Sequence, residues 1–258
     1  MGDIYALVSA GGAPGVTTAA LALALTWPSQ VVLAECDPSG GDILAGLLRG
    51  QVPARQGLTE HAIEAGRGLQ AAHSILASQL IPLDRDHSRM LLPGMTDPRQ
   101  ATGLGPAWSA IATTLVGEPA DVIADCGRLD AGDGQPLPVL LAARVVVVVL
   151  RPSLRQVWAA RSRIDILMRL LGGIGRLVLL LTGPGSRSAK DIASALGVQV
   201  SAQLPADGRT AAALSDGAAG RRRLISGQLI RSADKAGQAL RGHGHDVGAR
   251  ATEAGARP

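Results

Sequence analysis

The sequence predicts an α/β protein: a mostly parallel, twisted sheet of about seven strands with helices on both faces. Short apolar runs alternate with longer helix-like stretches along the chain. Two of these runs, RVVVVVL at 144–150 and RLVLLLT at 176–182, lack the alternation of half-exposed strands, as expected for strands buried on both sides. The 258 residues are 47% hydrophobic, which supports a large core, although the chain has no Phe and one Tyr.

The individual elements follow from these runs and from the residues that start and stop helices. Pro152 and Ser153 mark a helix start, and the pair Gly172-Gly173 marks a helix end. The segment 49–86 is expected to hold short helices and loops. The expected strands are Ile4–Ser9, Val31–Glu35, Met90–Leu92, Val122–Asp125, Arg144–Leu150, Arg176–Thr182 and Gln199–Gln203. The expected helices are Val16–Thr26, Pro98–Leu115, Leu154–Leu171, Ser188–Leu196 and Gly227–Leu240.

No linker or repeat divides the chain, so we expect one domain over residues 1–241 and a disordered polar tail over 242–258. The N-terminus has an acid and no basic leader, and no apolar run approaches the roughly 20 residues of a membrane-spanning helix. Cys36 and Cys126 are too few for a disulfide-stapled secreted fold and are expected to be buried thiols. These features predict a cytoplasmic protein without an integral membrane segment.

The stretch LVSAGGAPGVTTAALALAL, residues 7–25, has the pattern of a phosphate-binding loop between a strand and a helix. Its glycines allow a tight turn in which main-chain N–H groups and the positive end of the helix face a phosphate. A hydroxyl at Thr17 is placed to hold Mg²⁺. The alternative is a glycine-rich turn that only packs tightly. The candidate nucleotide-binding residues are Gly11, Gly12, Ala13, Pro14, Gly15, Val16, Thr17 and Thr18.

The loop lacks the lysine of the pattern G-x4-G-K-[ST], because Val16 occupies that position and no lysine precedes Lys190. One close cation–phosphate contact is worth about 4 kcal/mol of gross Coulomb energy at an effective dielectric near 20. The net loss is smaller, because the desolvation of a lysine is also avoided. Main-chain amides and a metal ion can therefore still bind a nucleotide, while stabilisation of a transition state suffers more.

Three acids at strand ends follow the loop along the chain. In VVLAECDPSGGD, Glu35 and Asp37 come at the end of a strand, and in ADVIADCGRLD a second strand ends in Asp125. Carboxylates beside a phosphate loop suit Mg²⁺ binding and water orientation, so Asp37 and Asp125 are the candidate catalytic residues and, with Thr17, the candidate metal ligands. A turn aspartate exposed to solvent is the alternative at Asp37.

This order of motifs resembles the ParA/MinD family of deviant-loop ATPases, in which the loop reads K-G-G-x-G-K-T-T. SAGGAPGVTT aligns with that loop without a gap, VVLAECDPSGG resembles the family's strand ending in D-x-D-P-x-G, and DVIADCGRL is similar to its switch segment. ARVVVVVLRPSLRQVWAARSRIDIL and GVQVSAQLPADGRTAAALSDG are similar to later family segments. The resemblance covers roughly residues 4–241 and implies a P-loop NTPase fold with ATP and Mg²⁺ as ligands.

The same alignment shows what is missing. Gly11 stands at the family's signature lysine, which reaches the partner's phosphates in a nucleotide-sandwich dimer, and Val16 stands at the second lysine. Arg128, Arg151 and Arg155 could substitute from switch-like strands, or could be ordinary surface arginines. The resemblance therefore implies a homodimer that binds nucleotide, with weak or absent ATP hydrolysis.

The resemblance implies a positioning role, with several alternatives for the partner. ParA-type members hold DNA non-specifically, and a basic strip of this chain could do the same or could simply face water. Proteins similar to TadZ and CpaE, which localise pilus or secretion machinery, share a weakened loop. A nucleotide-independent scaffold is a further alternative, and the missing lysine disfavours a phosphoryl-transfer enzyme. The basic strip comprises Arg221, Arg222, Arg223, Arg231, Lys235 and Arg241.

Overall fold

The computed structural model describes residues 1–12, 14–50, 56–130, 134–217 and 227–255. Within these ranges the strands form one eight-stranded sheet in the order β3-β4-β2-β5-β1-β6-β7-β8. Every pairing is parallel except that of β3 with β4. The predicted fold class is confirmed. The strands are β1 (Ile4–Ser9), β2 (Val31–Glu35), β3 (Ile81–Pro82), β4 (Arg89–Leu92), β5 (Asp121–Arg128), β6 (Val145–Leu150), β7 (Leu177–Thr182) and β8 (Val200–Leu204).

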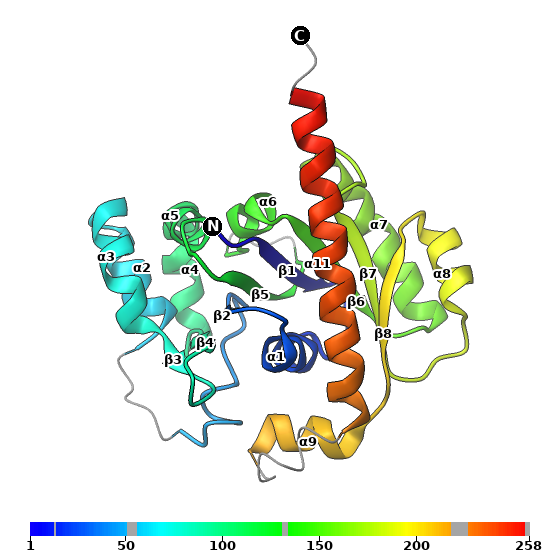
Figure 1. Ribbon diagram of the computed structural model, residues 1–258, viewed down its shortest axis with the longest axis horizontal. Coiled ribbons are helices and arrows are strands. Elements are labelled where there is room, and N and C mark those ends of the chain that lie inside the picture. Colours follow the sequence, from blue (N-terminus) through cyan, green and yellow to red (C-terminus); the bar gives the residue numbers. More distant parts are fainter. Residues whose placement is uncertain (13, 51–55, 131–133, 218–226, 256–258) are drawn as a thin grey trace.

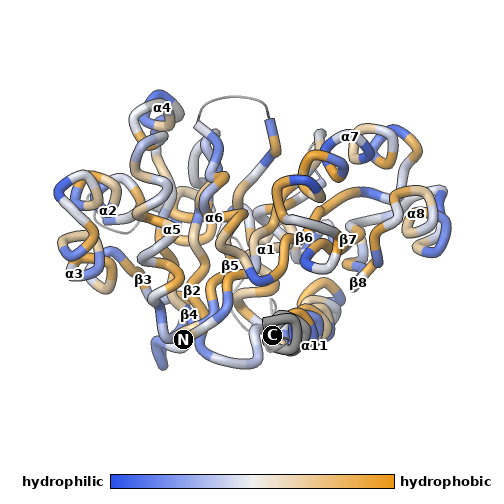
Figure 2. Tube along the Cα trace, turned by 90° about the horizontal axis from the view of Figure 1, so that it is seen from above, coloured by the Kyte–Doolittle hydropathy of each residue, from blue (hydrophilic) through white to orange (hydrophobic). Residues whose placement is uncertain are grey.

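Helices cover both faces of this sheet, and apolar residues concentrate in the strands between the two helical layers (Figures 1 and 2). One apolar core packs α1, α9 and α11 on one face, and a second packs α2, α3, α5, α6, α7 and α8 on the other. The helices are α1 (Val16–Thr26), α2 (Leu58–Ala65), α3 (Leu69–Gln79), α4 (Ala101–Leu104), α5 (Trp108–Val116), α6 (Leu137–Ala142), α7 (Leu154–Leu170), α8 (Ala189–Leu196), α9 (Gly208–Asp216) and α11 (Gln228–Gly255), with 3₁₀ turns at Pro98–Gln100 and Gly105–Ala107.

The central strand β1 fixes the place of the site. Its neighbours are β5 on one side and β6 on the other, so the chain changes direction across the sheet at β1. Ligands of open α/β sheets bind beyond the carboxyl ends of the strands at such a switch point. The glycine-rich loop between β1 and α1 lies at that position, and β2, β5, β6, β7 and β8 all end at the same edge because they run parallel to β1.

Several observed elements differ from the predicted ones: β5 is longer than the predicted strand Val122–Asp125, and the helices α6 and α9 were not predicted. The eighth strand, β3, was not predicted because two residues carry no periodic pattern. The helix predicted over 98–115 is instead a series of short turns followed by α5, since Pro106 lacks an N–H and Gly103 and Gly105 weaken helix continuity.

The tail predicted to be disordered from residue 242 is helical through Gly255, as part of α11. That prediction was wrong because it rested only on the scarcity of apolar residues in this segment. Here glycines bring the helix backbone close to the core: a Cβ at Gly244 would lie 2.9 Å from the Tyr5 hydroxyl oxygen, and one at Gly248 would lie 3.3 Å from Arg144 Nη1. His243 Nε2 is also 3.0 Å from the Gly175 carbonyl oxygen. Figure 1 shows α11 running beside α1 and β8, with its last turns extending past the sheet.

Among the described residues, no helix combines the length and the apolar composition that crossing a membrane requires.

Candidate functional site

The loop between β1 and α1 has the backbone of an anion-binding turn. Gly11, Gly12 and Gly15 have φ values of 155°, 67° and 90°, which other residues rarely adopt. Gly15 is the N-cap of α1 and no side chain caps this helix. The first N–H groups of a helix have no partner within the helix, so an anion at this end would satisfy them and would gain from the helix dipole.

The side chains of the loop are held away from this turn. Val16 is 7% exposed and packs in the apolar core around α1. Pro14 is buried, and its carbonyl oxygen accepts a hydrogen bond of 2.7 Å from Thr182 Oγ1 at the end of β7. Ala13, a predicted loop residue, lies outside the described residues. The structure therefore gives the Val16 side chain a packing role.

Asp125 lies at the centre of the site, buried on β5 beside β1. The Gly127 N–H donates a hydrogen bond of 3.0 Å to its carboxylate, and the nearby Thr17 hydroxyl lowers its pKa. The pKa of Asp125 is raised to about 7, chiefly by burial and also by the charges of Asp37 and Glu35, while the Thr17 hydroxyl and the Gly127 N–H oppose this rise. A nearby cation would therefore stabilise the charged form of this buried carboxylate.

Asp37 and Asp125 both lie against Gly127. Its carboxylate lies so close to Gly127 (φ 61°) that a Cβ there would overlap it. Asp37 is partly buried, and its Oδ1 accepts a hydrogen bond of 2.8 Å from the Ser39 N–H in the turn after β2. The structure thus brings Thr17, Asp37 and Asp125 to one end of the sheet, and their roles as metal ligands stay a prediction.

Glu35 has a different role from Asp37, although the two were expected to point the same way. Its Oε1 accepts a hydrogen bond from the Ile43 N–H (3.0 Å) and its Oε2 accepts one from the Gly94 N–H (3.1 Å). Burial raises the pKa of this carboxyl group, and the backbone hydrogen bonds lower it in part. Glu35 is therefore an anchor for two loops.

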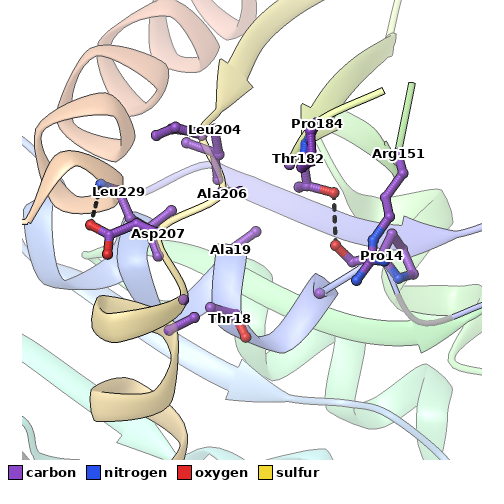
Figure 3. Close-up of a pocket in the computed structure, with 15 residues that line it drawn as sticks. Pro14, Thr18, Ala19, Arg151, Thr182, Pro184, Leu204, Ala206, Asp207 and Leu229 are labelled. Atoms are coloured by element: carbon purple, nitrogen blue, oxygen red, sulfur yellow. Dashed lines mark hydrogen bonds between the residues drawn. The ribbon is translucent and has the colours of Figure 1, made fainter. Parts of the chain in front are cut away.

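A cavity of about 290 Å³ opens beside the loop (Figure 3). Its walls come from the loop, the start of α1, the ends of β6, β7 and β8, and the residues after them. Asp207 in this wall caps α9, and its carboxylate also accepts from the Leu229 N–H at 3.3 Å. The cavity residues named in Figure 3 are Pro14, Thr18, Ala19, Arg151, Thr182, Pro184, Leu204, Ala206, Asp207 and Leu229.

The sequence predicted Pro14, Gly15, Thr18 and Arg151 as candidates, but it did not predict the cavity residues at the ends of β7 and β8. One part of this wall was indicated by the sequence, because LPAD at 204–207 follows a strand that ends at the same sheet edge as β1. Thr182 gave no such signal, because a threonine at the end of an apolar run is common in buried strands and its contact with Pro14 spans 168 residues of sequence.

Of the three candidate replacement arginines, Arg151 is the one whose side chain reaches the cavity, where it extends beside Pro14 (Figure 3). Arg128 is exposed and pairs with Asp130 at 3.1 Å. Arg155 is exposed on the first turn of α7. Arg151 is thus the arginine that the structure brings to the loop.

The predicted basic strip is broken by an ion pair. Arg241 Nε lies 3.2 Å from Asp121 Oδ2, so this arginine holds α11 to the start of β5. Arg231 and Lys235 are exposed on α11. Arg221, Arg222 and Arg223 lie outside the described residues.

The donor set fits magnesium better than a soft metal. Among the described residues, no three or more His, Cys, Asp or Glu side chains form a metal-binding group. Mg²⁺ usually binds one or two carboxylates, a hydroxyl, waters and phosphate oxygens, which matches Thr17, Asp37 and Asp125 beside an anion-binding turn. Cys36 and Cys126 are both buried free thiols, as predicted, and burial raises the pKa of each.

Solved structures with this architecture are ParA and MinD ATPases. A ParA family ATPase from Chlorobium tepidum TLS superposes with a TM-score of 0.74 and 17% identity, over 92% of this chain and 99% of that one. The septum site-determining protein MinD from Pyrococcus horikoshii OT3, complexed with Mg-ADP, gives 0.68 and 16%, over 93% and 96%. A plasmid partition protein from Borrelia burgdorferi B31, bound to AMPPNP, gives 0.68 and 15%, over 93% and 98%.

No family model and no curated protein sequence matches the chain. At these identities the structural likeness establishes the fold, so this chain has the fold of the ParA and MinD ATPases.

Proposed function

We propose that the chain binds a nucleoside triphosphate with Mg²⁺ at the glycine loop and acts as a nucleotide-controlled positioning factor. The observation that carries this proposal is the uncapped N-terminus of α1, with glycines of positive φ before it and Thr17 and the buried Asp125 beside it. The likeness to the MinD complexed with Mg-ADP and to the partition protein bound to AMPPNP supports it.

In this proposal the main-chain N–H groups at the start of α1 hold the phosphates. Thr17, Asp37 and Asp125 hold the metal ion, which neutralises phosphate charge when bound. The adjacent 290 Å³ cavity, with Leu204, Ala206 and other apolar groups in its wall, takes the base and sugar.

Hydrolysis is expected to be slow or absent. Oriented positive charge on the transferring phosphoryl group is the main source of catalysis in phosphoryl transfer. Within the described part of the loop, Gly11 and Val16 supply no such charge. Arg151 is the candidate replacement for the missing lysine, but its side chain approaches from the cavity side of Pro14.

Calorimetric titration of Mg·ATP into the purified chain tests the proposal. We expect saturable binding that weakens when EDTA removes magnesium. Val16→Lys should tighten binding about tenfold or more, because a hydrogen bond to a charged group contributes about 1.5–3 kcal/mol and the lysine stem can follow the loop to solvent. Val16→Met, which adds length without charge, is the matched control. A chain that binds no Mg·ATP, or equal affinities for the Lys and Met variants, would count against this account.

The partner is proposed to be a second copy of the chain, together with DNA or a secretion or pilus component. Lys235 is exposed on α11 and is the candidate contact to a DNA phosphate, whereas Arg241 is engaged with Asp121. Binding to random duplex DNA with and without ATP, across a salt series, separates these partners. Retention that requires ATP and falls steeply with salt favours DNA; absence of binding at low salt favours a protein cargo.

A nucleotide-independent scaffold is the second candidate, and one observation favours it. Along α7, Leu154, Trp158, Ile166 and Leu170 are 62%, 74%, 44% and 41% exposed. Leu154 with Trp158, and Ile166 with Leu170, are four residues apart and therefore neighbours on the helix surface. Exposed apolar patches often mark protein contacts. If Mg·ATP does not bind, this surface becomes the leading clue to function.

A further inference from the structure

Gln156 is a buried polar side chain directly over the glycine loop. It lies in the first turn of α7 and is 7% exposed. Its backbone N–H bonds to the Ser153 hydroxyl that caps the helix, at 3.4 Å, so the residue is fixed at the point where β6 passes into α7.

The orientation of the Gln156 amide is set by the backbone. Its Oε1 accepts a hydrogen bond of 2.9 Å from the Arg151 N–H. Because that N–H can be met by the carbonyl oxygen and not by the amide nitrogen, the NH₂ group must be the end that faces away from Arg151. A Cβ at Gly12 would lie 2.9 Å from this Nε2 and 3.9 Å from Gln156 Cδ, which places the NH₂ group against the loop.

No hydrogen bond joins the NH₂ group to another residue in the described part of the chain, while the other end of the amide is fixed on the Arg151 N–H. A donor held against the loop in this way points to an acceptor supplied from outside the chain. The acceptor expected at a glycine-rich turn before an uncapped helix is an anionic oxygen.

Helix α7 approaches the loop closely enough for this role. A Cβ at Gly11 would lie 3.9 Å from Ala159 Cβ, one turn beyond Gln156 on the same helix. Small residues at both positions let the first turn of α7 pack over the loop. Gly12, with φ 67°, leaves the space that the Gln156 amide occupies.

We propose that Gln156 is a neutral phosphate-binding residue that supplies, from α7, a hydrogen bond to the polyphosphate held by the lysine-free loop. This inference rests on the proposed nucleotide binding and adds a donor that no loop residue provides. A neutral donor orients an anionic oxygen without cancelling its charge, so it contributes to binding while adding little to phosphoryl transfer.

Two substitutions separate this role from a structural one. Gln156→Leu removes the NH₂ group and also the acceptor for the Arg151 N–H. Gln156→Glu keeps that acceptor but replaces the donor with a negative charge beside the phosphates. A structural role predicts that Glu is tolerated better than Leu, whereas a phosphate-binding role predicts the reverse order.

Calorimetric affinities for Mg·ATP, with thermal unfolding of each variant, decide between them. We expect about tenfold weaker binding for Gln156→Leu and about tenfold weaker again for Gln156→Glu, with the Glu deficit shrinking as salt rises. Gln238→Glu, the same charge change at an exposed position of α11, should bind as wild type does. Affinities of both Gln156 variants within twofold of wild type, or a Glu variant that binds better than the Leu variant, would overturn the proposal and leave nucleotide binding intact. A wild-type chain that binds no Mg·ATP would overturn both.

Discussion

Three strand-end acids of similar sequence context have three different environments. Asp125 is buried with a hydrogen bond from the Gly127 N–H and a raised pKa, Glu35 is held by the N–H groups of two loops, and Asp37 is partly exposed in a turn. The sequence predicted Asp37 and Asp125 as partners at one edge because both follow apolar strands. It could not predict the role of Glu35, because its partners, Ile43 and Gly94, lie in loops whose paths depend on tertiary contacts.

Asp125 is expected to make stability depend on pH. Its pKa rises from 3.8 to about 7 on folding, so the folded state holds this proton more tightly than the unfolded state. The resulting stabilisation is complete below pH 4 and is lost as pH rises to about 7. In metal-free urea unfolding from pH 4.5 to 8, the free-energy difference between wild type and Asp125→Asn should change by a few kcal/mol in this window, at about 1.4 kcal/mol per pKa unit. Parallel curves would show that this carboxyl group does not titrate there.

Glu35 is expected to matter for stability. Glu35→Ala leaves the buried Ile43 and Gly94 N–H groups without their acceptor, which should lower the free energy of unfolding by about 2–4 kcal/mol. Glu35→Gln retains one acceptor oxygen and should lose about half as much. Urea unfolding at pH 7 measures both, and an alanine variant as stable as wild type would refute the anchoring role.

At the scale of elements, regular strands and long helices were predictable, while short or glycine-rich ones were not. β6 and β7 were found within one residue of their observed bounds because fully buried strands give uninterrupted apolar runs. The last part of α11 was missed because its order depends on close backbone approach to Tyr5 and Arg144, and a sequence shows glycine there as a helix-weakening residue.

Two glycines of α11 test this account as a matched pair. Gly242→Ala adds a methyl group that meets nothing within 4 Å, so it should stabilise the protein by about 0.5–1 kcal/mol through helix propensity. Gly244→Ala makes the same change 2.9 Å from the Tyr5 hydroxyl oxygen, so overpacking should outweigh that gain and destabilise by about 1 kcal/mol or more. Thermal unfolding compares them, and equal stabilisation by both would mean that this part of α11 does not pack on the sheet.

At the scale of the whole molecule, the strand order converts distant sequence segments into one site. β1 delivers the glycine loop, β5 delivers Asp125, β6 leads to Gln156, and β7 and β8 form the cavity wall beside the loop. The sequence predicted the loop and the acids, whose residue types carry chemical meaning, but not Thr182 or Gln156, whose meaning arises only from the positions of β7 and α7. The domain boundary at residue 241 remains a prediction, although α11 continues past it.

The central claim is that main-chain amides, Thr17 and the strand-end acids hold a polyphosphate without a lysine in the loop. A crystal structure of the chain grown with Mg²⁺ and a non-hydrolysable ATP analogue tests it most directly. The account predicts phosphate oxygens on the first N–H groups of α1 and within hydrogen-bonding distance of Gln156 Nε2, metal at Thr17, and the base in the cavity beside Pro14. Analogue bound elsewhere, or a loop that stays empty at millimolar analogue, would contradict it.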